Sequence, residues 1–334
     1  MKKSLIALAV LAASGASFAQ STVTVYGTID TALTSIKSGD VTTTGVTPSA
    51  VATSVYGFKG SEDLGGGLKA NFKLENSFKG DTGASATAGS AFSREAWVGL
   101  SGGFGEVRLG KVSSAYNDPE AAAAPALGSN ALSPLFTVFQ SDAQENSRPK
   151  NTIYYATPSF SGVTGSVSYS LNEKTGNTLA TAALSDGDIA SLGLQYEAGP
   201  LYVGVGYQSD KPYLGNLAAE LTQVNVTYDL KVVKLLAAIG HVSNSGHAVG
   251  SASDWTIGAD IPVSSAIVLS TGYGSSKTTG SAADFKHTAF ALDGAYILSK
   301  RSLVYAGFET DTNTPVGGAD FKTTIFAVGI QHKF

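Results

Sequence analysis

The last fourteen residues of the chain, 321–334 (FKTTIFAVGIQHKF), alternate between apolar and polar positions. Phe326, Val328 and Ile330 share one face, and the residues between them share the other. A period of two indicates a β-strand with one apolar side. The stretch is long enough to cross a bilayer, which takes roughly 9–11 residues. It ends on Phe334, and an aromatic side chain suits the interfacial end of a membrane strand. The pattern predicts a membrane-spanning strand.

The start of the chain has the pattern of an export signal. Two lysines follow Met1, residues 5–13 (LIALAVLAA) are apolar, and residues 17–19 (SFA) form a small-x-small cleavage site. The apolar run is too short to span a bilayer as a helix. We therefore expect residues 1–19 to be a cleaved signal peptide and residues 20–334 to be a single mature domain.

Composition narrows the class of fold and of function. The chain has no cysteine, which excludes disulfides and thiolate chemistry. Loss of the two leader lysines takes the formal charge from −4 to −6, which argues against a nucleic-acid partner. No mature segment has eighteen consecutive apolar residues, so no transmembrane helix is expected. The average hydropathy is still compatible with a membrane barrel, because lipid-facing and lumen-facing residues alternate in such a barrel.

Sixteen alternating segments follow one another without a break in composition. Strands are expected near 23–35, 52–63, 68–78, 94–101, 106–112, 151–157, 163–171, 190–198, 201–209, 221–229, 232–242, 253–261, 266–275, 286–298, 302–311 and 321–334. Seven short turns rich in Gly, Pro and Ser alternate with eight long loops, at 36–51, 79–93, 113–150, 172–189, 210–220, 243–252, 276–285 and 312–320. This sorting predicts an all-β fold, a 16-stranded antiparallel transmembrane β-barrel closed by its first and last strands.

Several segments carry a resemblance to a known family. They are residues 23–30 (VTVYGTID), 57–69 (GFKGSEDLGGGLK), 94–100 (REAWVGL), 104–111 (FGEVRLGK), 151–158 (NTIYYATP) and 331–334 (QHKF). In this order, behind a signal peptide, they resemble the general diffusion porins of β-proteobacterial outer membranes. The resemblance implies a homotrimer in outer-membrane lipid that passes ions and small hydrophilic solutes passively, without a cofactor or enzymatic activity. It also implies that the third long loop folds into the barrel and that the outer-membrane assembly machinery reads Phe334.

The third long loop, residues 113–150, is the candidate constriction. Loops beyond about 15 residues are usually functional or disordered, and the apolar residues of this one favour packing against the barrel wall. The acidic side of the constriction is predicted at Asp118, Glu120, Asp142 and Glu145, and the basic side at Lys59, Arg94, Arg108 and Lys111 on the wall, with Arg148 at the return of the loop. Opposed charges would set a transverse field across the pore and bias ion choice.

Two details of this prediction remain open. Arg94 has the parity of Ala96 and Val98, so only its position at the rim would turn its side chain inward. Val55 and Glu95 stand where the family often has a basic or neutral polar residue, so the sign of the ion selectivity is not predicted.

A substrate-specific channel of the same fold is the main alternative to a passive pore, and an adhesive role of the outer loops is compatible with either. An outer-membrane enzyme needs a nucleophile, a base and an orienting group within reach. The sequence has no Gly-x-Ser-x-Gly elbow, and its four histidines have no metal-ligand spacing. Residues 105–112 (GEVRLGKV) approach a phosphate-binding loop but lack its Ser or Thr and lie in an alternating strand.

Overall fold

The computed structural model describes residues 22–123, 125, 127, 130–139, 146–171, 188–211, 219–244, 250–280 and 284–334. The predicted signal peptide lies outside the described residues. In the described part of the chain, no helix is long and apolar enough to cross a membrane.

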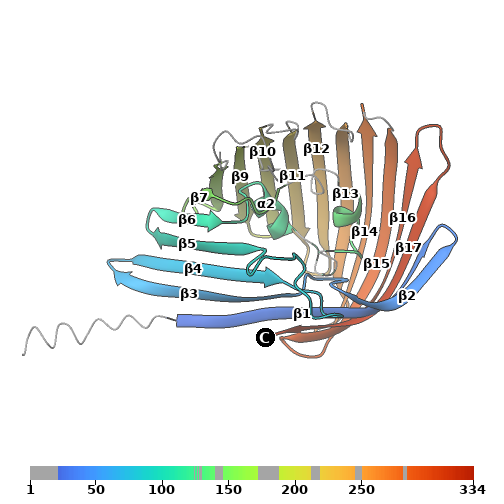
Figure 1. Cartoon of the computed structure of the whole chain (residues 1–334), viewed down its shortest axis with the longest axis horizontal. Helices are drawn as coiled ribbons and strands as arrows, with labels where there is room; N and C mark the ends of the chain where they lie inside the picture. The colour runs from blue at the N-terminus through green and yellow to red at the C-terminus, as the bar shows by residue number, and fades with distance from the viewer. Residues whose placement is uncertain are drawn as a thin grey trace, which may run out of the picture.

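All strands belong to one antiparallel sheet that closes on itself (Figure 1). They are β1 (Thr22–Ser38), β2 (Val41–Pro48), β3 (Val55–Gly65), β4 (Leu68–Ser77), β5 (Glu95–Gly102), β6 (Gly105–Lys111), β7 (Thr152–Ala156), β8 (Val163–Ser170), β9 (Ile189–Ala198), β10 (Leu201–Asp210), β11 (Ala219–Asp229), β12 (Lys234–Asn244), β13 (Ser251–Pro262), β14 (Ile267–Thr279), β15 (Phe285–Ile297), β16 (Ser302–Pro315) and β17 (Phe321–Lys333). The seam joins β1 to β17, from Thr28 opposite Lys333 to Ser38 opposite Thr323. The predicted closure of the barrel by its first and last strands is confirmed.

One predicted loop contains a strand instead. Residues 36–51 were expected to form a loop, but β1 continues to Ser38 and turns through Gly39 into β2. The reason is local, because the Thr- and Val-rich sequence of β2 (VTTTGVTP) suits an extended backbone. β3 pairs with residues 22–28 of β1, and β2 pairs with residues 31–38 of β1. The two strands therefore follow one another along the same side of β1. Because β2 and β3 together occupy one position beside β1, the barrel still has the predicted sixteen strands around its circumference, and β2 lengthens the wall at the loop end.

Glycine allows the tight turn between β3 and β4 at one end of the barrel. Between β3 and β4, Gly65, Gly66 and Gly67 have φ values of 84°, 62° and 81°. L-residues with a Cβ rarely adopt this left-handed region, so glycine is needed at such a turn. The other six short connections also fall where the sequence predicts them, between β5 and β6, β7 and β8, β9 and β10, β11 and β12, β13 and β14, and β15 and β16.

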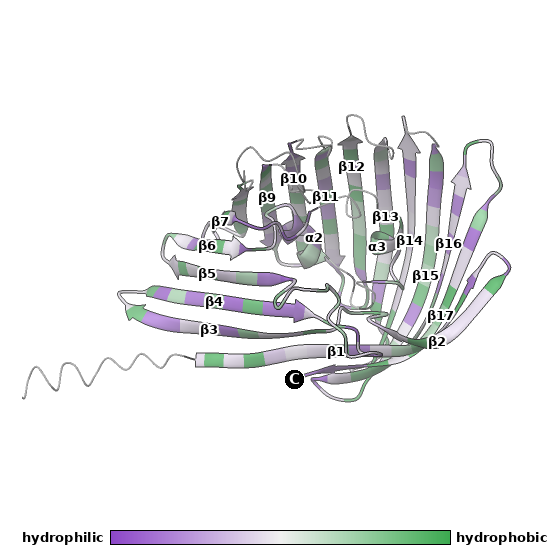
Figure 2. Ribbon diagram, in the orientation of Figure 1, coloured by the Kyte–Doolittle hydropathy of each residue, from purple (hydrophilic) through white to green (hydrophobic). Residues whose placement is uncertain are grey.

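The two faces of the wall differ as the alternation predicts, and hydropathy changes in bands along the strands (Figure 2). Outward-facing side chains such as Val98, Leu109 and Val328 are 59%, 50% and 64% exposed, as expected of a surface that lipid covers. The wall is also uneven in height. Strands β13 to β17 have 12 to 14 residues, whereas β5 to β8 have only 5 to 8.

Candidate functional site

Residues 113–150 are here called the inward segment, and their described residues, 113–123, 125, 127, 130–139 and 146–150, pack against the inner side of the wall. Their two short helices are α2 (Asn117–Ala123), which contacts β9, β10 and β11, and α3 (Pro134–Val138), which contacts β13 to β16. Figure 1 shows α2 inside the curve of the sheet. Tyr116, Val138 and Phe139 are at most 1% exposed. The apolar residues of the segment thus lie against the wall, as the sequence predicts.

Polar contacts hold the first half of the inward segment. Tyr154 and Ser166 each donate a hydroxyl hydrogen bond to Asp118 Oδ2, both at 2.7 Å. Gln223 Nε2 donates to the Tyr116 carbonyl at 2.8 Å, and the hydroxyl of Tyr202 donates to the Pro119 carbonyl at 3.0 Å. These donors come from four strands, so the start of α2 is tied to a broad area of the wall.

Asp118 lies in a setting that changes its ionisation. Burial raises the pKa of its carboxyl group above the ordinary value, and the nearby charge of Glu95 acts in the same direction. The hydrogen bonds from Tyr154 and Ser166 and the charge of Arg108 act against this rise in pKa. Burial prevails, so Asp118 takes up a proton at a higher pH than an exposed aspartate does.

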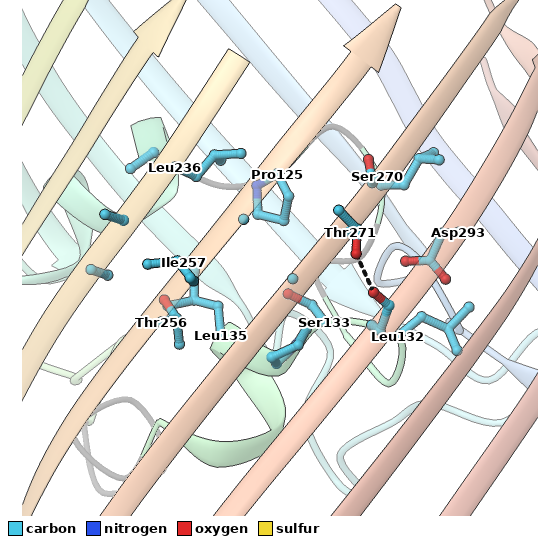
Figure 3. A pocket seen from close by; sticks show the side chains of 18 of the residues that line it. Pro125, Leu132, Ser133, Leu135, Leu236, Thr256, Ile257, Ser270, Thr271 and Asp293 are labelled. Atoms are coloured by element: carbon cyan, nitrogen blue, oxygen red, sulfur yellow. Dashed lines mark hydrogen bonds between the residues drawn. The ribbon is translucent and has the colours of Figure 1, made fainter. Parts of the chain in front are cut away.

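Residues 130–139 of the inward segment pack on β12 to β16. The hydroxyl of Thr137 donates to Glu309 Oε1 at 2.6 Å, and Glu309 itself is fully buried. Leu132 and Leu135 help to line a cavity of about 50 Å³ between the segment and the wall (Figure 3). The carboxyl group of Asp293, only 3% exposed, also lines it, and the volume suffices for a few waters.

Glycines on the inner face of the wall form two seats for this segment. On β14, a Cβ at position 274 would lie 2.7 Å from Val138 Cγ2, and one at Gly272 would lie 3.4 Å from Pro134 Cδ. On β10, a Cβ at Gly204 would lie 2.6 Å from Pro119 Cβ. At Gly274 and Gly204 the segment therefore approaches the wall more closely than a side chain would allow, whereas the distance at Gly272 is that of an ordinary contact.

The basic wall residues lie on β3 to β6 among carboxylates. Arg94 Nε bonds to Glu75 Oε1 at 2.7 Å, and Lys73 Nζ lies 3.3 Å from Glu75 Oε2 and 2.9 Å from Glu95 Oε1. Arg94 precedes β5, and the Glu75 side chain to which it bonds has the lumen parity of β4. Lys59 is exposed, and its Nζ lies 5.2 Å from the centre of the Tyr26 ring.

Arg108 stands between aromatic rings. Its guanidinium carbon lies 4.8 Å from the centre of the Trp97 ring and 4.9 Å from that of Tyr154, and its Nη2 bonds to Glu106 Oε2 at 2.6 Å. Stacking of this kind fixes a guanidinium in place. Lys111 Nζ donates to the Arg148 carbonyl at 2.6 Å, which joins the wall to the return of the inward segment.

The predicted site residues thus differ in their surroundings. Asp118, at the start of the inward segment, faces Arg108 on β6, whose charge acts to lower the pKa of the Asp118 carboxyl group. Glu120 is only 2% exposed, so it lies inside the packing of α2. Asp142 and Glu145 lie outside the described residues. Whether the set forms a constriction stays a prediction.

Of the carboxylates that bond to the basic wall, the sequence analysis named Glu95 but did not select Glu75 or Glu106 as site residues. The lumen parity of Lys73 and Glu75 was the signal that could have selected Glu75. Glu309, which anchors α3, gave no such signal, because its partner Thr137 lies 172 positions away in the chain. Among the described residues, no group of His, Asp and Glu is arranged to hold a metal ion.

A closed membrane-type barrel with short turns at one end, long loops at the other and a polar inner wall defines the outer-membrane β-barrel channels. The Gram-negative porin family matches residues 5–315, and the chain belongs to this family. It is therefore a porin channel of the Gram-negative outer membrane and not an enzyme.

Individual relatives agree with this assignment. The chain is 33% identical to outer membrane porin protein 32 of Delftia acidovorans, over 99% of this chain and 95% of that protein. An anion-selective porin from Comamonas acidovorans has a solved structure with a TM-score of 0.78 and 29% identity, over 94% of this chain and all of that one. The trimer form of OmpT from Vibrio cholerae shares the fold at a TM-score of 0.70 and 16% identity, over 94% of this chain and 99% of that one.

Proposed function

We propose that the barrel is a passive, water-filled diffusion channel whose cross-section is set by the inward segment. The observation that carries this proposal is the seating of α2 and α3 on the inner wall, with Val138 and Phe139 buried and glycines beneath them. At sixteen strands a barrel is too wide for its own side chains to fill, so an aqueous path remains beside the segment. Small hydrophilic solutes and ions would pass along it without covalent chemistry.

We assign part of the predicted set to the two sides of the narrow part and add the carboxylates that bond to the wall. Asp118 stands on the segment side and Lys59, Arg94, Arg108 and Lys111 on the wall side. Glu75, Glu95 and Glu106 bond to wall cations and weaken the positive field. The field across the pore is therefore local and is strongest near the exposed Lys59.

The exposure of these charged groups supports a modest preference of the channel for anions over cations. Buried carboxylates on the opposite wall, such as Asp293 and Glu309, are at most 3% exposed and face the inward segment. Lys59 is exposed to the lumen instead. The Comamonas acidovorans relative described as anion-selective supports the same sign.

We further propose that three copies assemble, with the low wall at their contact. Strands β5 to β8 have 8, 7, 5 and 8 residues, below the roughly 9–11 that a bilayer crossing requires. A second copy against this part of the wall would shield it from mismatched lipid. Residues 1–19 would direct export, and Phe334 would be recognised during assembly in the membrane.

The proposal is tested by reversal potentials and by solute flux. Purified protein in a planar bilayer under a KCl gradient is expected to give a reversal potential on the anion-selective side. Lys59→Met should move this potential toward cations, whereas Lys322→Met, in β17 at the loop end, should leave it in place. In liposome swelling, small sugars are expected to enter at rates that fall with size and do not saturate. Saturable entry of one sugar class would favour a substrate-specific channel instead.

A further inference from the structure

We propose that the inner wall of β1, β3, β4 and β5 holds a binding site for small aromatic monocarboxylates. Thr24, Lys59, Lys73 and Trp97 lie directly opposite one another on these four neighbouring strands. Cross-strand neighbours of this kind have Cβ atoms about 4.5–5.5 Å apart, so the four side chains form one row. A cavity of about 370 Å³ lies over the row, in the usual size range of small-molecule sites.

The charge of this wall favours a single negative group. Four cations, Lys59, Lys73, Arg94 and Arg108, stand beside three carboxylates, Glu75, Glu95 and Glu106. In the described part of the chain, each of these cations except Lys59 lies within 4 Å of a carboxylate oxygen. Lys59 therefore has no carboxylate partner among these groups, and its side chain lines the cavity. A monocarboxylate bound to Lys59 would balance its positive charge with a charge-assisted hydrogen bond.

Trp97 favours a ligand that carries an aromatic ring. Its indole Nε1 donates to Glu95 Oε2 at 2.6 Å, and Arg108 stacks on the ring at 4.8 Å, so the indole is held in one orientation. A fixed indole lining a cavity offers a surface on which a planar ring packs. Asn71 Nδ2 donates to Ser101 Oγ at 2.8 Å in the same cavity, which provides polar partners for a ring hydroxyl. These features together select a hydroxylated aromatic acid over an aliphatic one.

This proposal rests on the proposed channel only for the route by which the solute arrives. Binding is therefore measured without conductance, by tryptophan fluorescence of the folded protein in detergent. The chain has two tryptophans, and the second, Trp255, is 42% exposed on the outward face of β13. The Trp255→Phe variant leaves Trp97 as the single reporter. Titration with 4-hydroxybenzoate is expected to change its emission along a saturating curve.

Matched variants and competitors identify the groups that bind. Lys59→Met should weaken binding about tenfold or more, the range of a lost hydrogen bond to a charged group. Lys322→Met should leave the affinity unchanged. Cyclohexanecarboxylate should displace 4-hydroxybenzoate about fivefold less well than benzoate does, because it has the carboxylate but no aromatic face. A non-saturating titration, an unchanged affinity in Lys59→Met or equal displacement by the two competitors would overturn the proposal, even if the channel conducts normally.

Discussion

The ring of Phe334 lies over Gly27, at the seam where the last strand meets the first. The two residues also exchange main-chain hydrogen bonds, from the Phe334 amide to the Gly27 carbonyl at 3.0 Å and from the Gly27 amide to the Phe334 carbonyl at 3.1 Å. A Cβ at position 27 would overlap the Phe334 ring. The aromatic residue thus covers a glycine on the outer face and completes the closure of the barrel.

Substitution of Gly27 by valine is therefore expected to weaken the seam. The added side chain meets the Phe334 ring and, at 2.6 Å, the Val55 carbonyl oxygen of β3, and overpacking of this kind costs about 1–3 kcal/mol. The measurement is the temperature at which the folded barrel loses its β-sheet circular dichroism. Gly45→Val is the control, because a Cβ at Gly45 in β2 would have no neighbour within 4 Å. Equal melting of the two variants would show that the contact does not stabilise closure.

A graded pair of substitutions on β14 tests the seat of the inward segment. Gly274→Ala places a methyl group 2.7 Å from Val138, which pushes α3 away from the wall and into the lumen. Single-channel conductance should fall. Gly272→Ala, on the same face of the same strand, places its methyl group at an ordinary 3.4 Å from Pro134 and should conduct as the parent does. A Gly274→Ala channel of unchanged conductance would contradict the seating of α3.

The absence of cysteine makes the facing of each strand directly testable. Lys59→Cys introduces a thiol on the lumen face of β3, and Phe58→Cys introduces one on the outward face beside it. A charged, membrane-impermeant thiol reagent is expected to change the conductance of the Lys59→Cys channel within the recording. The Phe58→Cys channel should not respond. The reverse pattern would mean that the strand is turned the other way.

Acidification is expected to change ion selectivity in two steps. Because burial raises the pKa of Asp118, this carboxyl group is neutralised as the pH falls, before exposed carboxylates are. The first loss of negative charge should shift the reversal potential toward anions. The folded protein also binds this proton more readily than the unfolded chain does, so the same fall in pH contributes to the stability of the folded state relative to the unfolded chain. Asp118→Asn should lack the first step, and an identical pH profile in the variant would place Asp118 outside the ion path.

The fold was largely predictable from the sequence, whereas the partners of the site residues were not. Strand parity depends on neighbouring residues, so it correctly placed Val328 outward and Lys73 inward. Turn chemistry is equally local, as at Gly65 to Gly67. The hairpin of β1 and β2 was missed because its threonines are compatible with either a loop or a strand. Contacts such as Thr137 with Glu309 depend on where a long segment comes to rest, which no local pattern encodes.

The central claim is that this chain forms an aqueous pore narrowed by residues 113–150, and single-channel recording tests it most directly. Purified protein in a planar bilayer should give stable, ohmic current steps, in groups of three if three copies assemble. A variant in which Tyr116, Val138 and Phe139 are all changed to serine should lose the packing of the segment and give steps of altered size and higher noise. Absence of any conductance from correctly folded protein would contradict the pore, and unaltered steps in the triple variant would contradict the narrowing role of the segment.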